Sequence, residues 1–216
     1  MTPQAFLFDL DGTLVDTAPD MAGALNRLRA EHDIAPLPFD AIRPWVSHGA
    51  TALVKLGFGH DLSTERLEAL RLRYLDIYAA HLCVDSVLFP GMAGVLEALE
   101  AQGRAWGVVT NKPSFLTEPL LEGLRLHTRA GCIVSGDTLP VRKPDPAPVR
   151  HACGLLGLPE SACVMIGDAE RDIASARAAG SPSIAAAFGY VLEGDDPHAW
   201  GADAVVEHAE ELHGWI

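Results

Sequence analysis

The chain has 216 residues, a formal net charge of −13 at pH 7, 49% hydrophobic residues and 21% charged residues. The apolar fraction excludes a disordered chain, and the length allows one or two domains with a buried core. The negative charge argues against nucleic acid or an anionic membrane as a partner, because both are bound by clustered Lys and Arg side chains.

Membrane and export signals are not evident in the sequence. The first apolar stretch, Ala5 to Leu10, is short and contains Asp9, and no run of eighteen apolar residues occurs. We therefore expect neither a secretory signal nor a transmembrane helix. The four cysteines form no CxxC pair and have no histidine at zinc-ligand spacing, which indicates reduced, mostly buried thiols. A cytoplasmic location is the expectation.

Short apolar runs alternate with amphipathic helices along much of the chain. Continuous apolarity is typical of parallel strands that are covered on both faces. The predicted strands are Phe6 to Phe8, Ala105 to Thr110, Cys132 to Ser135, Cys163 to Ile166, Ser183 to Ala187 and Ala204 to Val206. Alternation of such strands with helices predicts a doubly wound, Rossmann-like α/β sheet.

Glycines mark the ends of the helices between these strands. A glycine follows each of three predicted helices, Met92 to Gln102, Ala147 to Leu156 and Ala169 to Ala179, and can supply the left-handed conformation needed there. Asp145 is predicted to cap its helix, with Pro146 as the first helical residue.

The block from Thr17 to Leu82 is predicted to be entirely helical. One helix is expected over Asp20 to His32. Another begins near Ser63 and carries an apolar stripe of Leu67, Leu70, Tyr74 and Ile77. This insert is far longer than an ordinary connection and follows the carboxyl end of a strand, where it can cover a site. We therefore predict an all-helical cap, residues 17–82, and an α/β core, residues 1–16 and 83–216.

An acidic motif, Asp9-Leu10-Asp11-Gly12-Thr13, directly follows the first strand. Residues two apart in an extended segment point the same way, so Asp9 and Asp11 are expected to face the crevice beyond the strand. Two close carboxylates repel each other unless a cation or a shared proton intervenes. The motif therefore suits a Mg²⁺ site or a carboxylate nucleophile beside a general acid and base. A solvated Asp-Gly turn is the alternative.

Three more polar groups follow other predicted strands. They are Thr110-Asn111-Lys112, Lys143, and Gly167-Asp168 with Asp172. Each alone could be a helix cap or a solvated side chain. Because ligands bind beyond the carboxyl ends of the strands in open α/β sheets, the four groups together predict one site.

The four motifs, their order and the helical insert resemble the haloacid dehalogenase-like phosphatases over nearly the whole chain. The resemblance implies that Asp9 attacks phosphorus and forms an aspartyl-phosphate. It implies that Asp11 protonates the leaving oxygen and then activates water, while Thr110 and Lys143 bind phosphoryl oxygens. The implied Mg²⁺ ligands are Asp9, Asp11 through its backbone carbonyl region, Asp168 and, in a supporting position, Asp172.

Within this family the chain is similar to the phosphoglycolate phosphatase group. The shared segments are residues 108–113, 143–146 and 188–190. Residues 16–20, 106–109 and 195–203 are similar, more narrowly, to N-acetylmuramic acid 6-phosphate phosphatases. The resemblance implies hydrolysis of one of these two small phosphomonoesters, the second of them in peptidoglycan recycling. The sequence has no heptad pattern that indicates an oligomeric state, and a monomer or homodimer is the expectation.

Substrate-binding candidates come from the core and from the predicted cap. In the core, Gly12 can expose backbone N–H groups to an anion, and Asn111 and Lys112 stand at a strand end. In the first cap loop, where the family contacts the leaving group, the candidates are Arg43, Ser47, His48 and Gly49.

Alternative functions differ in what they require at these positions. Relatives that cleave carbon–halogen bonds or phosphonates lack the second acid, which is present here as Asp11. Sugar phosphomutases of the family commonly carry Val at the position of Thr13, so a hydrolase is favoured over a mutase. A receiver-type signalling domain also combines acids, Thr and Lys, but it is shorter and has no long helical insert. A catalytically silent binding module is the remaining alternative.

Overall fold

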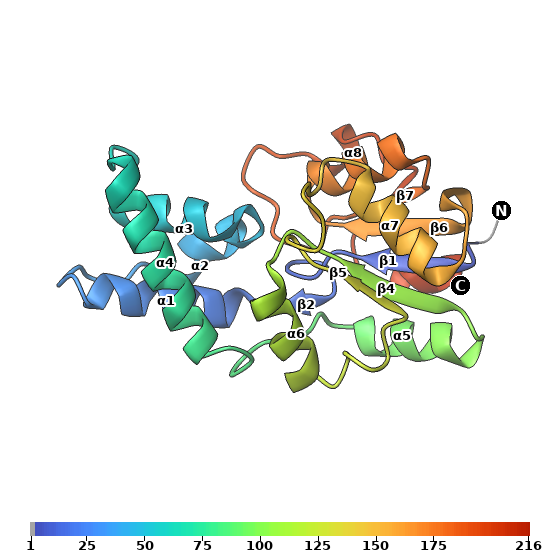
Figure 1. The fold of residues 1–216 in the computed structure, drawn as a ribbon, viewed down its shortest axis with the longest axis horizontal. Coiled ribbons are helices and arrows are strands. Elements are labelled where there is room, and N and C mark those ends of the chain that lie inside the picture. Colours follow the sequence, from blue (N-terminus) through green and yellow to red (C-terminus); the bar gives the residue numbers. More distant parts are fainter. Residues whose placement is uncertain (1–2) are drawn as a thin grey trace.

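The computed structural model describes residues 3–216 and shows a sheet-containing core beside a group of helices (Figure 1). The core sheet is six-stranded, in the order β5-β4-β1-β6-β7-β8. Its strands are β1 (Ala5–Phe8), β4 (Ala105–Val109), β5 (Cys132–Val134), β6 (Cys163–Gly167), β7 (Ser183–Ala186) and β8 (Ala204–Val206). Every neighbouring pair is parallel, and this confirms the predicted doubly wound α/β sheet.

Helices cover both faces of this sheet, with α5 (Met92–Ala101) and α6 (Ser114–Gly123) on one side and α7 (Ala147–Leu156) and α8 (Glu170–Ala179) on the other (Figure 1). Phe6 and Phe8 pack into one apolar cluster, and Leu7 packs into a second one on the opposite face. Burial on both faces explains why the central strands are continuously apolar instead of alternating.

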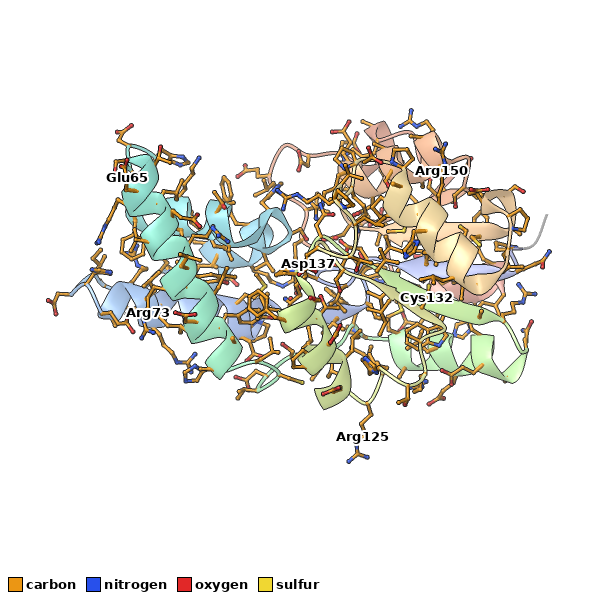
Figure 2. The ribbon with its side chains drawn as sticks, viewed as in Figure 1. Glu65, Arg73, Arg125, Cys132, Asp137 and Arg150 are labelled. Atoms are coloured by element: carbon orange, nitrogen blue, oxygen red, sulfur yellow. The ribbon has the colours of Figure 1, made fainter. Side chains whose placement is uncertain are left out.

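The separate group of helices, within residues 17–82, comprises α1 (Ala18–Ala30), the short α2 (Phe39–Ile42), a 3-10 helix (Arg43–His48), α3 (Gly49–Phe58) and α4 (Thr64–Ala80). Ser63 caps α4, since its Oγ accepts the Arg66 N–H at 3.2 Å. Tyr74 on α4 is buried against α1 and donates its hydroxyl to the Met21 carbonyl oxygen at 3.2 Å. Figure 2 shows Glu65 and Arg73 on α4, far from Cys132 and Arg150 of the core.

A neck connects the helices to the core. It consists of β2 (Val15–Asp16) and β3 (Val87–Leu88), which pair antiparallel. The buried carboxylate of Asp20 accepts the backbone N–H groups of Val84, Asp85 and Ser86 at 2.9–3.0 Å. These bonds hold the returning chain against the start of α1, so the two chain crossings between helices and core lie side by side.

The structure corrects the local sequence predictions at a few places. The helix predicted over Ala147 to Leu156 is observed with these bounds as α7, but its N-cap is Pro146 and not Asp145; Asp145 Oδ1 accepts the Ala147 N–H at 2.8 Å. Helix α6 was not predicted and contains Pro119 in its interior. Within the block predicted to be helical, the sequence does not delimit α3; burial of Leu53 and Val54 stabilises this helix.

Two smaller findings concern the membrane and the thiols. No helix within residues 3–216 is long and apolar enough to cross a membrane. Cys132, Cys153 and Cys163 are buried, Cys83 is half-buried, and all four are free thiols.

Candidate active site

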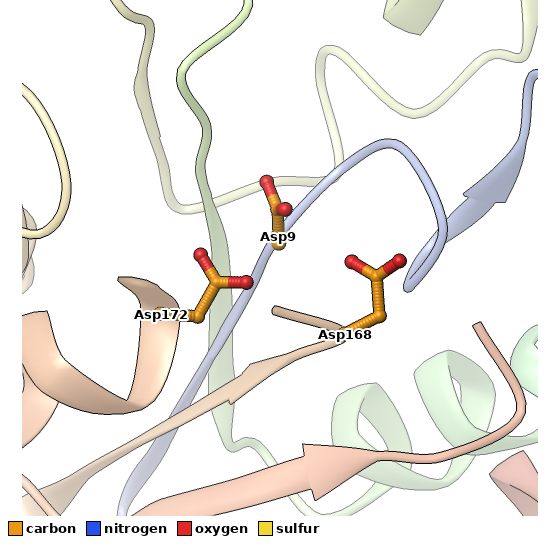
Figure 3. Close-up of side chains that lie close together, drawn as sticks. All are labelled: Asp9, Asp168 and Asp172. Carbon is orange, nitrogen blue, oxygen red and sulfur yellow. The ribbon is translucent and has the colours of Figure 1, made fainter. Parts of the chain in front are cut away.

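Three acidic side chains meet beyond the carboxyl ends of two adjacent strands. Asp9 follows β1, Asp168 follows β6, and Asp172 lies in the first turn of α8. One carboxylate oxygen of each lies within 4.8 Å of the others (Figure 3). Asp9 and Asp168 are each 2% exposed and Asp172 is fully buried. Like charges this close in a buried place require a cation or bound protons.

The pKa shifts of these carboxyls show how the charge is balanced. Burial, followed by the neighbouring carboxylates of Asp9 and Asp172, raises the pKa of Asp168 to about 7. Burial also raises the pKa of Asp172, although Lys143 opposes the shift. Burial acts to raise the pKa of Asp9 as well, but Lys143 and Arg171 hold it below its ordinary value. Asp9 is therefore ionised at neutral pH.

Lys143 is the buried cation of this group. Its Nζ lies 3.0 Å from Asp9 Oδ1 and 2.7 Å from Asp172 Oδ1, and it donates a hydrogen bond to the Val109 carbonyl oxygen at 2.5 Å. The Asn111 side chain holds the Lys143 backbone, because its Nδ2 donates to the Lys143 carbonyl oxygen and its Oδ1 accepts the Lys143 N–H. Asn111, predicted to bind substrate, is therefore engaged in positioning Lys143.

The Asp11 side chain makes its contacts away from the three carboxylates. Its Oδ1 accepts hydrogen bonds from Thr17 Oγ1 at 2.6 Å and from Lys112 Nζ at 2.9 Å. Lys112 Nζ also donates to the Tyr78 hydroxyl at 2.9 Å. Since Tyr78 lies on α4, this chain of contacts joins the helical group to the core at the site.

Two glycines allow the backbone to close around Asp168. Gly12 has φ +89°, and a Cβ there would lie 2.0 Å from Asp168 Oδ2. A Cβ on Gly189 would lie 2.3 Å from Asp168 Cβ and 2.4 Å from the Gly12 carbonyl oxygen. The Tyr190 N–H donates to Asp168 Oδ2 at 2.9 Å. Gly12, predicted to contact an anion, is placed against Asp168.

The predicted cap-loop residues divide into two groups. Ser47, His48 and Gly49 line a cavity in front of Asp9, and Ser47 Oγ donates to Asp168 Oδ2 at 2.7 Å. Arg43 is not among the residues that line this cavity. Its guanidinium lies 3.6 Å from Asp16 and stacks over the Tyr190 ring at 4.8 Å from the ring centre.

The cavity has a volume of about 550 Å³ and lies between the core and the helices. Core residues in its wall include Asp9, Asp11, Thr110, Asn111, Lys112 and Arg171, and helical residues include Ser47, His48, Arg71, Tyr74 and Tyr78. Thr110, at the end of β4, is buried, and its Oγ1 accepts the Lys112 N–H at 3.1 Å. The arrangement combines an ionised carboxylate, nearby cations and a cavity that can hold a ligand, which suits transfer of an anionic group.

Tyr74, Tyr78 and Arg171 are among the wall residues that the sequence does not predict as site residues. Tyr74 and Tyr78 are four residues apart on one face of α4, and Tyr74 was assigned to the apolar core stripe. Their hydroxyls were the signal for a polar role. Arg171 lies between Asp168 and Asp172, so its place within the acidic motif could have identified it.

Comparisons with known proteins agree with this geometry. The family model of haloacid dehalogenase-like hydrolases matches residues 3–180. A phosphoglycolate phosphatase of Xanthomonas campestris is 43% identical over 97% of this chain and 95% of its own. An N-acetylmuramic acid 6-phosphate phosphatase of Pseudomonas aeruginosa is 42% identical over 98% and 94%. The crystal structure of a predicted phosphoglycolate phosphatase from Haemophilus somnus has a TM-score of 0.87 at 27% identity, covering 99% of this chain and 98% of that one.

Proposed function

The chain belongs to the haloacid dehalogenase-like hydrolases and is a phosphatase, and from this premise we propose that it hydrolyses a phosphomonoester through a covalent intermediate on Asp9. The observation that carries the proposal is the buried, ionised Asp9 carboxylate, held by Lys143 at the floor of a cavity between the core and the helices. A carboxylate fixed in this way can act as a nucleophile toward phosphorus.

The contacts of Asp9 favour Oδ2 as the attacking atom. Oδ1 accepts the Leu10 N–H at 2.8 Å and lies 3.0 Å from Lys143 Nζ, whereas Oδ2 has no hydrogen bond within residues 3–216. In the proposed first step, Oδ2 forms a bond to phosphorus, the ester P–O bond breaks, and the leaving oxygen takes a proton from Asp11. In the second step, a water oxygen attacks phosphorus and gives a proton to Asp11, while the bond between Asp9 and phosphorus breaks.

Mg²⁺ fits the carboxylates that surround Asp9. The donors are hard oxygens, and the raised pKa of Asp168 reflects burial and negative charge that no nearby cation fully offsets. In our proposal Asp9, Asp168 and the Asp11 carbonyl oxygen hold the ion, with Asp172 supporting the site through Lys143. Bound Mg²⁺ supplies positive charge against the phosphoryl oxygens.

We also propose that residues 17–82 act as a cap over a core of residues 1–16 and 83–216. Support comes from Ser47 and Tyr78, which belong to the helices and contact Asp168 and Lys112 of the core. A cap that contacts the residues around Asp9 reduces the access of water to them and places leaving-group contacts above the phosphoryl site.

For the substrate, we propose N-acetylmuramic acid 6-phosphate. The cavity volume of about 550 Å³ lies within the range of sites that enclose drug-sized ligands, whereas a two-carbon acid would fill only part of it. 2-Phosphoglycolate is the second candidate, because several relatives of similar identity are phosphoglycolate phosphatases by name.

A panel of phosphomonoesters compared by kcat/KM tests the proposal. We expect N-acetylmuramic acid 6-phosphate to have the highest value, turnover to require Mg²⁺, and EDTA to abolish it. Asp9→Asn is expected to remove turnover while the fold is kept. A higher kcat/KM for 2-phosphoglycolate would identify this compound as the substrate instead. Release of an isomeric sugar phosphate instead of inorganic phosphate would identify a mutase.

A further inference from the structure

Five cationic side chains line or adjoin the cavity, namely Arg71, Lys112, Arg142, Lys143 and Arg171. Three of them, Lys112, Lys143 and Arg171, contact Asp9 or Asp11, and these three differ in how many of their N–H donors are already engaged. We propose that Arg171 donates to the non-bridging oxygens of the phosphoryl group and so acts as a catalytic residue. This inference rests on the proposed phosphatase function and adds Arg171 to Lys143 and Thr110, the phosphoryl-binding residues that the sequence predicts.

Lys143 Nζ is surrounded by three protein oxygens before any anion binds. An ammonium group has three N–H donors. Three oxygens already lie within 3.0 Å of Lys143 Nζ, namely those of Asp9, Asp172 and Val109. The Lys143 side chain is fully buried as well, so it is absent from the cavity wall. Its evident role is to hold Asp9 and Asp172, and binding a phosphoryl oxygen would require giving up one of these contacts.

Lys112 has most of its donors engaged. Its Nζ donates to Asp11 Oδ1 and to the Tyr78 hydroxyl, both at 2.9 Å, which leaves one of three N–H groups. Lys112 therefore offers a single hydrogen bond to a group that carries three non-bridging oxygens.

Arg171 has donors available in the right place. Its Nε is buried and has no hydrogen-bond partner within residues 3–216. Its Nη2 lies 3.8 Å from Asp9 Oδ2, an ion-pair distance that is too long for a hydrogen bond. The side chain is 22% exposed and forms part of the cavity wall. A guanidinium beside a carboxylate usually makes short, paired hydrogen bonds, and this one does not.

The 3.8 Å between Arg171 Nη2 and Asp9 Oδ2 leaves the guanidinium free to contact a group that becomes bonded to Oδ2. Asp9 Oδ2 is the proposed attacking atom, and it is the Asp9 oxygen that faces Arg171. A phosphoryl group bonded to Oδ2 carries its oxygens within reach of the guanidinium. The planar fork of Arg171 can then satisfy two of these oxygens at once, which a single ammonium donor cannot do.

Titration of inorganic phosphate into the Mg²⁺-loaded protein tests this role without turnover. The variants are Arg171→Gln, Arg171→Lys and, as a matched control on the same helix, the exposed Arg177→Gln. We expect Arg171→Gln to weaken phosphate binding by about 10- to 100-fold, the range for hydrogen bonds to a charged group. Arg171→Lys should recover part of this loss, and Arg177→Gln should bind phosphate like the wild type.

Steady-state kinetics with an aryl phosphate and a sugar phosphate add a second readout. A residue that contacts the phosphoryl group lowers kcat/KM for both esters by the same factor. Unchanged phosphate binding in Arg171→Gln, or a kinetic loss for one ester only, would overturn the inference. Phosphate binding and kinetics of Arg171→Lys equal to those of the wild type would also overturn the inference, because they would show that only the positive charge matters. If Arg171→Gln does not fold, Arg171→Lys alone decides whether the guanidinium binds the phosphoryl group. If the wild type cleaves neither ester, the proposed function fails, while the phosphate titration still decides the role of Arg171.

Discussion

Replacing Lys143 by methionine should destabilise the protein strongly, because the substitution keeps most of the side-chain volume and removes the ammonium group. Lys143 is fully buried between Asp9 and Asp172, at 3.0 and 2.7 Å from one oxygen of each. Removing one partner of a buried ion pair leaves uncompensated charge and costs about 3–5 kcal/mol. We expect the free energy of unfolding of Lys143→Met at pH 7 to fall by this amount.

Urea denaturation followed by circular dichroism measures the loss. Lys55→Met is the control, since Lys55 lies on α3 and has no ion pair within residues 3–216. The decrease in the free energy of unfolding should be smaller near pH 5. Removal of Lys143 raises the pKa values of the buried carboxyls, so that at this pH they are protonated and neutral in the folded protein. The double variant Lys143→Met with Asp172→Asn should recover part of the stability, since one of the unpaired charges is gone. A loss below about 1 kcal/mol, the range of an exposed ion pair, would refute this reasoning.

Three further predictions concern the metal and the substrate. Gly189→Ala should weaken Mg²⁺ binding, because the added Cβ would lie 2.3 Å from Asp168 Cβ and displace this carboxylate. Calorimetric titration measures the affinity, and Gly154→Ala is the control because the space around its Cβ is open. Mg²⁺ affinity should fall about tenfold per pH unit below the Asp168 pKa of about 7 and level off above it, because the proton must leave before Asp168 can bind the ion. His48→Ala should raise KM more than it lowers kcat, since His48 lines the cavity above Asp9.

Each of these has an outcome that contradicts it. Equal Mg²⁺ affinity in Gly189→Ala and Gly154→Ala would show that the close approach to Asp168 is unimportant. A Mg²⁺ affinity that is flat between about pH 5 and pH 8 would remove Asp168 from the ligand set. Unchanged KM in His48→Ala with the preferred substrate would exclude His48 from leaving-group contact.

The sheet could be predicted from the sequence because each strand is buried on both faces. Phe6, Leu7 and Phe8 are all fully buried, and such a run has few alternatives to a central parallel strand. The approach of Asp9 and Asp168 could be anticipated for the same reason, since both follow strands whose carboxyl ends lie at one edge of the sheet.

Side-chain partners within the site could not be predicted, because they depend on rotamers and on contacts between distant segments. Asn111 and Arg43 are polar residues near the site, but the Asn111 amide is engaged by the Lys143 backbone and Arg43 by Asp16 and Tyr190. Tyr78 differs from these two residues, because the sequence places it on an apolar helix face and gives no sign that its hydroxyl accepts a hydrogen bond from Lys112 in the site. Spacing identifies the face of a helix but not which polar atom from a distant segment of the chain contacts it.

Borohydride trapping of the covalent intermediate tests the central claim most directly. Borohydride reduces an aspartyl-phosphate to homoserine, so peptide mass spectrometry after quenching during turnover identifies the residue that carried the phosphoryl group. We predict homoserine at position 9, only when substrate and Mg²⁺ are both present, and none in Asp9→Asn. Steady turnover with no homoserine, or with homoserine at another acidic residue, would contradict the assignment of Asp9 as the nucleophile.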